Sequence, residues 1–416
     1  MPSTDTSISH SLWSRTVYVV AFVWLLLLWL LVWSWRDDGI VPTSERESDG
    51  PTNVIAPIEP LITIPEDMGT LCTSDTYNAG QWVRREKLLQ ADKPSDIEKV
   101  AGYHCSGGFP HKCYRRLNEG NEFNRSKHIM DYVWQPSGCE LVPFDANRFS
   151  EYLSNHPLVF IGDSINQLEF ESMGCLLGEK MVNPPGDTQL SGGDRNMWVS
   201  QLVHKDKLQV EGAVSLAYLR SDYLVRLDDF KLMEPNDDEG YLIGKGSNFP
   251  WVHAISRFDH IVINTAAHWH TDKKWGSNES DEEMMDAYRR AMRIIFDYLQ
   301  RNLRPVQRVW VRSTPYGHAK CSRYTEPSKT PVVPTRKDGE YQWDMFDKMD
   351  QVWKEMIDEA QDYRIRFFNV SHMANLRGDA HSRPDSDCLH TCLPGPVDDW
   401  NKLLFHEIAR EAAGSA

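Results

Sequence analysis

Ser164 is the residue of this chain best suited to nucleophilic chemistry. It follows Gly162 and Asp163 directly after the apolar run 158–161, and a segment of helical apolar periodicity continues from it to Leu177. A serine on a tight turn between a strand and a helix exposes its hydroxyl, and the first backbone N–H groups of the helix can stabilise an oxyanion. The alternative is that the serine only caps the helix, a role that serine often fills. The tripeptide alone does not decide between them.

Asp387 and His390 form a second candidate pair, in the segment Asp-Cys-Leu-His near the carboxyl end of the chain. A serine nucleophile needs a base whose pKa lies near neutrality, and histidine is the usual choice. The base needs a partner, often a carboxylate, that fixes its tautomer and stabilises its cation. Residues three apart lie on the same side of a helical turn or tight loop, so Asp387 can orient His390. The alternative is a polar surface loop without a function.

Alternating strands and helices are expected to bring these residues together. Short apolar runs predict strands at 158–161, 260–264, 308–313 and 364–370. Apolar periodicity predicts helices from the Ser164 turn to 177 and at 283–302, 341–361 and 398–413. This alternation predicts an α/β fold with a largely parallel sheet flanked by helices. Sites in such sheets form beyond the carboxyl ends of the strands, which points to the loops 162–164, 264–270 and 371–396.

The combined pattern resembles the SGNH or GDSL hydrolase superfamily, and more closely the trichome-birefringence-like and PC-esterase family of polysaccharide O-acetyltransferases. The matching stretches are 162–164, 171–172, 175–177, 259–265, 268–269, 387–395 and 400–404. Cys72 and the stretches 80–83, 134–139 and 144–145 resemble the cysteine-bearing N-terminal module of that family. The family commonly has Arg, Asn and Gln where this chain has Gln167, Leu168 and Glu169, which suggests a divergent member.

The resemblance implies an SGNH-hydrolase-like sheet and transfer of an acetyl group through an acyl-enzyme on Ser164, with His390 as base and Asp387 orienting it. The implied oxyanion and substrate-binding residues are Gly162, Asp163, Asn264, His268 and Trp269. We expect a polysaccharide or oligosaccharide acceptor, an acetyl donor such as acetyl-CoA or another acetylated compound, no tightly bound cofactor and no metal. The alternatives are a carbohydrate acetylesterase, which uses water as the acceptor, and a non-catalytic glycan-binding or wall-organising protein.

The first 70 residues predict a membrane anchor and a stem. Val17–Trp33 contains 17 residues and no charge, and as a helix it would span about 25 Å, enough for a thin bilayer. The bulky residues after it argue against a cleaved signal peptide. We expect a cytosolic tail at 1–16, a transmembrane anchor at 17–35, a proline-containing stem at 36–70 and a lumenal catalytic domain at 71–416.

Cysteines, glycosylation sequons and net charge bear on the compartment and the partners. All eight cysteines follow the predicted anchor: Cys72, Cys105, Cys113, Cys139, Cys175, Cys321, Cys388 and Cys392. Their even number and the lack of paired CxxC spacing favour disulfides over zinc, with the pairing open. Sequons at Asn124, Asn278 and Asn369 also follow the anchor. We expect a single-pass type II protein of the Golgi membrane.

The net charge of −15 argues against a nucleic-acid partner, and the oligomeric state stays open.

Overall fold

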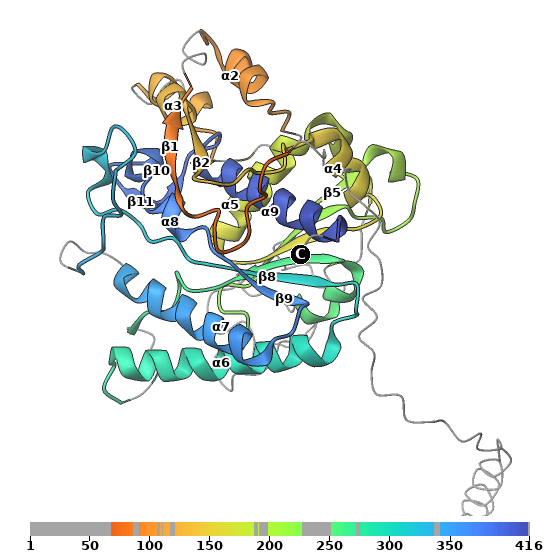
Figure 1. Ribbon diagram of the computed structural model, residues 1–416, viewed down its shortest axis with the longest axis vertical. Helices are drawn as coiled ribbons and strands as arrows, with labels where there is room; N and C mark the ends of the chain where they lie inside the picture. The colour runs from red at the N-terminus through yellow and green to blue at the C-terminus, as the bar shows by residue number, and fades with distance from the viewer. Residues whose placement is uncertain are drawn as a thin grey trace, which may run out of the picture. The chain divides into compact units, whose positions relative to one another are not determined.

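The folded part of the chain is a sheet covered by helices on both faces (Figure 1). The computed structural model describes residues 68–85, 91–105, 109, 111–116, 121–186, 190, 199–226, 251–271, 275, 277–336 and 342–414. These residues belong to one compact unit that begins at Ile55.

The central sheet has seven strands in the order β4-β5-β6-β3-β7-β8-β9. The strands β6, β3, β7, β8 and β9 are parallel to one another, whereas β5 is antiparallel to β6 and β4 is antiparallel to β5. The predicted α/β fold is therefore confirmed, and the sheet is mixed rather than parallel throughout. Its strands are β3 (Leu158–Gly162), β4 (Met181–Val182), β5 (Val199–His204), β6 (Leu216–Arg220), β7 (His260–Asn264), β8 (Arg308–Arg312) and β9 (Ile365–Phe368).

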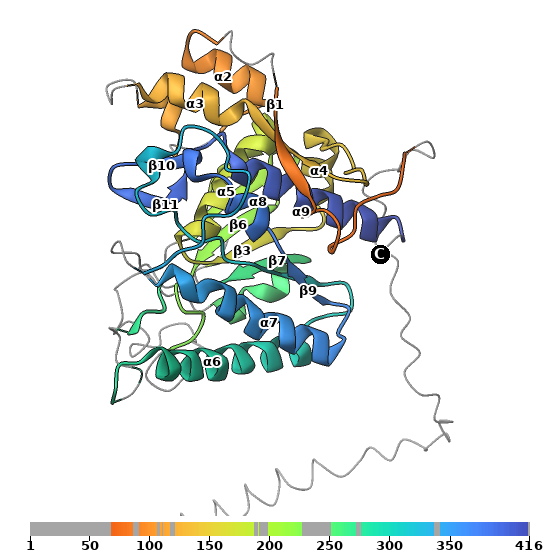
Figure 2. The same cartoon turned by 60° about the vertical axis from the view of Figure 1, so that its left-hand side comes forward.

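Helices cover the two faces of this sheet in separate layers. Figures 1 and 2 show α5 and α9 on one face and α6 and α7 on the other. The helices are α2 (Pro94–Ala101), α3 (Glu122–Met130), α4 (Ala146–Leu153), α5 (Ser164–Leu177), α6 (Asp281–Asn302), α7 (Phe346–Ala360), α8 (Ser371–Ala374) and α9 (Pro396–Ala412). Three of them begin at other residues than the sequence predicts. A capping box between Ser280 and Glu283 starts α6 at Asp281, a 3₁₀ turn precedes α7, and Pro396 supplies the first residue of α9.

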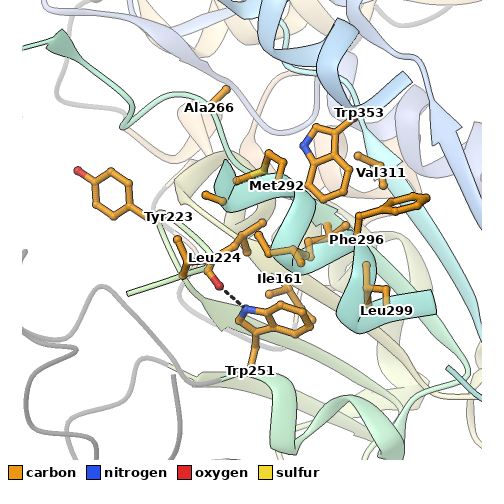
Figure 3. Packing of buried hydrophobic residues seen from close by; sticks show 14 of the residues in the cluster. Ile161, Tyr223, Leu224, Trp251, Ala266, Met292, Phe296, Leu299, Val311 and Trp353 are labelled. Carbon is orange, nitrogen blue, oxygen red and sulfur yellow. Dashed lines mark hydrogen bonds between the residues drawn. The ribbon is translucent and has the colours of Figure 1, made fainter. Parts of the chain in front are cut away.

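The period of two along the strands supplies both halves of the core. In β3, Val159 and Ile161 pack with the helices α6 and α7, whereas Leu158 and Phe160 pack with α5 and α9. All four side chains are fully buried. Figure 3 shows part of the first cluster, in which the indole of Trp251 donates a hydrogen bond to the carbonyl oxygen of Leu224 (2.9 Å). A strand buried on both faces holds the chain that follows it in a fixed place, and Ser164, the candidate nucleophile, lies two residues after the end of β3.

The residues before α4 form a small module that is fastened to the main body. Its antiparallel pair is β1 (Gly80–Arg84) and β2 (Tyr132–Pro136). The indole of Trp82 donates to the carbonyl oxygen of Met373 (2.8 Å), and the ring Nε2 of His406 in α9 lies 2.9 Å from the carbonyl oxygen of Cys72. This module corresponds to the cysteine-bearing N-terminal module that the sequence predicts.

All eight cysteines are in disulfides, as predicted. The pairs are Cys72–Cys139, Cys105–Cys175, Cys113–Cys392 and Cys321–Cys388. The last two pairs include the cysteines on either side of His390, so the candidate base lies in a segment that is covalently fixed at two points.

The predicted tail, anchor and most of the stem, at 1–67, lie outside the described residues and stay predictions. Within the part of the chain that the structure describes, no helix has both the length and the apolar composition that a membrane span requires.

Candidate active site

The structure brings three predicted residues into one hydrogen-bonded chain. The hydroxyl oxygen of Ser164 lies 2.7 Å from Nε2 of His390, and Nδ1 of His390 lies 2.9 Å from a carboxylate oxygen of Asp387. A carboxylate only accepts hydrogen bonds, so Nδ1 carries the proton and Nε2 is the acceptor that faces the serine hydroxyl. This is the tautomer in which histidine can take the serine proton.

Asp163, rather than Ser164, caps the helix that follows β3. One carboxylate oxygen of Asp163 accepts from the backbone N–H of Ile165 (2.9 Å), and Ser164 is the first residue of α5. The serine hydroxyl therefore does not serve as the helix cap, the alternative role considered for it. Its backbone N–H lies in the first turn, where N–H groups have no acceptor within the helix.

Gly162 is required by the close approach of two strands. Its backbone adopts φ 150°, and a Cβ atom at this position would lie 2.2 Å from the carbonyl oxygen of Asn264 and 2.9 Å from the side chain of Asn166. A contact of 2.2 Å with a backbone atom could be removed only by moving one of the two strands. Gly162 thus contributes to the site by letting the chain turn tightly into Ser164.

Asp387 and His390 lie on a strand, not on the helical turn or tight loop that the sequence suggested. They belong to β11 (Asp387–Thr391), which pairs with β10 (His381–Arg383). The pairing shifts register between His381 and Arg383, because four steps along β11 oppose two steps along β10. This irregularity lets Asp387 fold back, and its carboxylate accepts from the backbone N–H groups of Leu389 and His390 (both 3.1 Å).

The surroundings of Asp387 keep its carboxyl group ionised. Burial acts to raise its pKa, but the hydrogen bond and charge of His390 and the backbone N–H groups outweigh burial and hold the pKa well below its usual value. An anion fixed beside Nδ1 orients the imidazole and stabilises the imidazolium that forms when the ring accepts a proton.

Asn264 has the predicted position but its amide is already engaged. It ends β7, next to Gly162 of β3, and its Nδ2 donates to the carbonyl oxygen of Arg312 (2.7 Å) and the hydroxyl of Thr314 (2.8 Å). A role as oxyanion donor would require one of these bonds to be given up.

Trp269 does not have the exposed position that a sugar contact needs. Its side chain is fully buried, its Nε1 donates to the hydroxyl of Thr265 (3.0 Å), and its ring stacks on Trp275 with centroids 4.7 Å apart. The sequence interpretation of Trp269 as a substrate-binding residue was therefore wrong, because the indole completes the core beside α6.

His268 differs, since its side chain is 34% exposed and Nε2 lies 3.8 Å from a carboxylate oxygen of Asp222. A substrate contact by His268 stays a prediction.

The three residues that depart from the family pattern have structural partners in this chain. Leu168 is buried, and Glu169 is fully buried with its carboxylate 2.9 Å from Nε of Arg312. Gln167 donates to the carboxylate of Glu171 (2.9 Å). Burial raises the pKa of Glu169 to about 7, although Arg312 acts to lower it. Glu169 is therefore the partner of Arg312 in the protein interior rather than a residue that assists the nucleophile.

Sequence reasoning missed His111, whose ring lies against that of His390 (centroids 5.6 Å apart, 20° between planes). It also gave no role to Glu171, whose carboxylate lies 2.9 Å from Nδ1 of His111. The spacing of seven residues from Ser164 could have suggested Glu171, because helical positions i and i+7 share a face. No local signal could have found His111, which the Cys113–Cys392 disulfide brings in from a distant part of the chain.

A metal-ligand geometry does occur among the described residues, at Cys113, Glu122 and Cys392. The two sulfurs form a disulfide, however, so neither is the thiolate that a metal ion would require.

The predicted glycosylation sites differ in accessibility. Asn124 and Asn278 are exposed, whereas Asn369 is partly buried and its carbonyl oxygen accepts a hydrogen bond from Asn78 (2.7 Å). Modification is therefore easier at the first two residues.

Comparison with known protein families gives one match that spans more than half of the chain. The family is described as PC-Esterase, the GDSL/SGNH-like acyl-esterase family found in Pmr5 and Cas1p, and it matches residues 141–407. This range includes Ser164, Asp387 and His390.

Curated relatives carry related names at low identity. Protein trichome birefringence-like 9 of Arabidopsis thaliana is 24% identical over 80% of this chain and 83% of its own length. Xylan O-acetyltransferase 12 of Oryza sativa subsp. japonica is 25% identical, over 65% of this chain and 59% of its own length. Xyloglucan O-acetyltransferase 4 of Populus trichocarpa is 24% identical over 72% of this chain and 74% of its own length. The match thus spans less than two thirds of the rice relative and more of the other two.

Proposed function

Because this chain belongs to the PC-Esterase family, we propose that it is a polysaccharide O-acetyltransferase that moves an acetyl group to a sugar hydroxyl through an acyl-enzyme on Ser164. The names of the relatives, which include xylan and xyloglucan O-acetyltransferases, support the reaction class. The observation that carries the proposal is the hydrogen-bonded chain from Ser164 through His390 to Asp387.

The first half of the proposed reaction acetylates the enzyme. Nε2 of His390 takes the proton from the hydroxyl of Ser164 while the serine oxygen attacks the acetyl carbonyl of the donor. The backbone N–H of Ser164, at the start of α5, stabilises the resulting oxyanion. When this intermediate collapses, the bond to the leaving group breaks, the leaving group takes the proton from His390, and the acetyl ester of Ser164 remains.

The second half passes the acetyl group to the acceptor. A sugar hydroxyl gives its proton to His390 and its oxygen attacks the carbonyl of acetyl-Ser164. Collapse of the second intermediate releases the serine oxygen, which takes the proton back from His390. Nothing is oxidised or reduced, so the reaction needs only an acetyl donor, either acetyl-CoA or another acetylated compound, and the polysaccharide or oligosaccharide acceptor.

The proposal includes a location on the lumenal side of the Golgi membrane. Four disulfides support folding in an oxidising compartment. The uncharged segment Val17–Trp33 supports a single N-terminal anchor, and the exposed Asn124 and Asn278 would be accessible to glycosylation.

Product analysis of a nucleophile variant tests the proposal. The purified protein is incubated with an acetyl donor and oligomers of xylan, xyloglucan, mannan and pectin, and the products are identified by mass spectrometry. We expect acetylated oligomers from the unmodified protein and a rate at least about 10³-fold lower from Ser164→Ala. Thermal denaturation should give the same Tm for both, and Ser154→Ala, a serine of the α4 end, should keep the full rate.

Other outcomes would identify the alternatives. Retention of the rate by Ser164→Ala would refute the nucleophile. Release of acetate from acetylated oligomers, without transfer to an added oligomer, would indicate an acetylesterase. Failure of a serine-directed phosphonate to label Ser164, together with binding of oligomers and no turnover, would indicate a glycan-binding protein.

A further inference from the structure

A second histidine–carboxylate pair lies directly against the proposed base. The ring of His111 is stacked on the ring of His390, with centroids 5.6 Å apart and 20° between the planes. Nδ1 of His111 lies 2.9 Å from a carboxylate oxygen of Glu171. The side chains of His111 and Glu171 are 15% and 2% exposed, so the pair is largely shielded from water.

Glu171 is well placed to hold His111 in one orientation. It follows Ser164 by seven residues on α5, so the two side chains leave the same face of the helix. One carboxylate oxygen of Glu171 accepts from the amide of Gln167 (2.9 Å), and the other faces His111. Because a carboxylate cannot donate, Nδ1 of His111 must be the donor. The ring is thereby fixed in both tautomer and orientation.

A disulfide and a backbone hydrogen bond fix the position of His111 relative to His390. Cys113 and Cys392 each follow one of these histidines by two residues, and they form a disulfide. The backbone N–H of Leu393 also donates to the carbonyl oxygen of His111 (2.9 Å). The two backbone segments therefore run side by side immediately after the two rings, which explains the stacking of side chains that are far apart in sequence.

We propose that His111, held by Glu171, is a positioning residue for His390, keeping its imidazole in the plane in which Nε2 meets the hydroxyl of Ser164 and stabilising its cation. This inference rests on the proposed function, because it assigns a partner to the base of that reaction. Asp387 holds only one nitrogen of the ring, so the imidazole can still tilt about that hydrogen bond. A flat, immobile ring against its face opposes such tilting.

The stabilisation of the cation follows from the charges on the two sides of His390. A cation is attracted to the face of a π-system. The ring of His111 donates a hydrogen bond to the carboxylate of Glu171, and this bond increases the electron density of the ring that faces His390. The titratable groups around His390 are Asp387 on its own strand, His381 on β10, and Glu171 beyond His111. Removal of the Glu171 charge therefore destabilises the imidazolium of His390.

Substitutions at His111 test the positioning role, with His104 as the matched control. His104 also pairs with a carboxylate, Glu179 (3.7 Å), but in an exposed position of the N-terminal module. We expect His111→Ala to lower kcat on the order of 10-fold, to leave KM for the acceptor oligomer within about twofold, and to slow phosphonate labelling of Ser164 in proportion. His111→Phe, which keeps a flat ring without the hydrogen bond, should recover part of the loss. His104→Ala should match the unmodified protein.

The pH profile of Glu171→Gln supplies a readout that a purely structural role would not move. Loss of the Glu171 anion removes a negative charge that stabilises the imidazolium of His390. The acidic limb of the kcat/KM profile should shift to lower pH in Glu171→Gln and stay unchanged in His104→Ala.

Three results would overturn the inference. One is a kcat and labelling rate of His111→Ala equal to those of His104→Ala, and another is a raised KM with unchanged kcat, which would make His111 an acceptor contact. The third result combines two measurements: the acidic limb of the kcat/KM profile does not shift in Glu171→Gln, and His111→Phe is fully active. This result decides the question even if His111→Ala does not fold. A fully active Ser164→Ala variant would refute the proposed function itself, so the two failures are distinguishable.

Discussion

The pKa values of single carboxyl groups in this protein are shifted in opposite directions according to what surrounds them. Asp387 is held as an anion by His390 and two backbone N–H groups. Burial raises the pKa of Glu169, Asp350 and Asp398 to about 7 in each case, because the charged form loses its hydration. The carboxyl group with the lowered pKa is thus at the site, where its anion can stabilise a cation, and the three raised pKa values belong to groups of the interior.

Asp387→Asn tests this charge directly. An asparagine of the same size keeps a hydrogen-bonding group beside His390 but removes the anion, so the imidazolium loses its stabilising partner and the tautomer is no longer fixed. We expect kcat to fall about 10²-fold to 10⁴-fold, with little change in KM, in a transfer assay near neutral pH. Asp385→Asn, an exposed carboxylate of the same turn, should retain full activity. Equal kcat values for the two variants would contradict the role of Asp387.

The site is assembled by elements of very different kinds. Ser164 begins α5 after the fully buried strand β3, and its position depends on core packing. His390 lies on β11, half of a two-stranded sheet with an irregular register. A two-stranded pair is at best marginally stable alone, so the disulfides at Cys388 and Cys392 fix the part of the site that the core does not.

The Cys113–Cys392 disulfide is therefore expected to affect activity more than other disulfides do. We expect the double variant Cys113→Ser/Cys392→Ser to lose more than about 10-fold in kcat, because the rings of His111 and His390 separate. The matched variant Cys72→Ser/Cys139→Ser removes a disulfide of the N-terminal module. Each should cost about 2–5 kcal/mol in unfolding free energy, which urea denaturation measures. Equal loss of kcat per unit of lost stability in the two variants would contradict this expectation.

The elements that were predictable from the sequence are those with a local signal. The strands at 158–161 and 260–264 are continuous apolar runs, and the structure confirms both because they are buried on two faces. β5 mixes polar and apolar residues without a strict alternation, and β11 contains the polar Asp387 and His390. Neither has a pattern that distinguishes it from a loop.

The site was predictable only in part, for a related reason. The sequence identified Ser164, Asp387 and His390, which the structure brings within hydrogen-bonding distance. The interpretation of Trp269 was wrong, because the sequence does not distinguish an aromatic residue that is buried in the core from one that lines a cleft. It missed His111, because a contact made through a disulfide with a sequence separation of 279 leaves no trace in local spacing.

At the scale of the whole molecule, His406 connects the two ends of the described chain. Its Nδ1 accepts from the backbone N–H of Val142 (3.0 Å), and Nε2 donates to the carbonyl oxygen of Cys72 (2.9 Å). This arrangement requires a neutral imidazole. Burial lowers the pKa of His406 to about 4, with a smaller contribution in the same direction from Arg410.

The stability of the folded protein should consequently depend on pH through His406. The pKa of a histidine in the unfolded chain is about 6.5, so between about pH 6.5 and pH 4 the unfolded state binds more protons and His406 favours folding less as pH falls. His406→Gln, which can still accept and donate, should remove this component. We expect the stability difference between the unmodified protein and His406→Gln to decrease by about 1–2 kcal/mol from pH 7 to pH 5. Urea denaturation at both pH values measures this difference, and a constant difference would contradict the assignment.

The bridge between Cys113 and Cys392 also has a consequence for when the protein becomes active. A nascent chain synthesised only as far as residue 380 already contains the serine, yet it has neither the imidazole that would deprotonate it nor the sulfur that would bring His111 into place. The complete site therefore requires that the chain has been synthesised beyond residue 392 and that Cys113 and Cys392 have been oxidised. Under the function proposed here, the polypeptide does not react with acetyl esters before His390 has been synthesised.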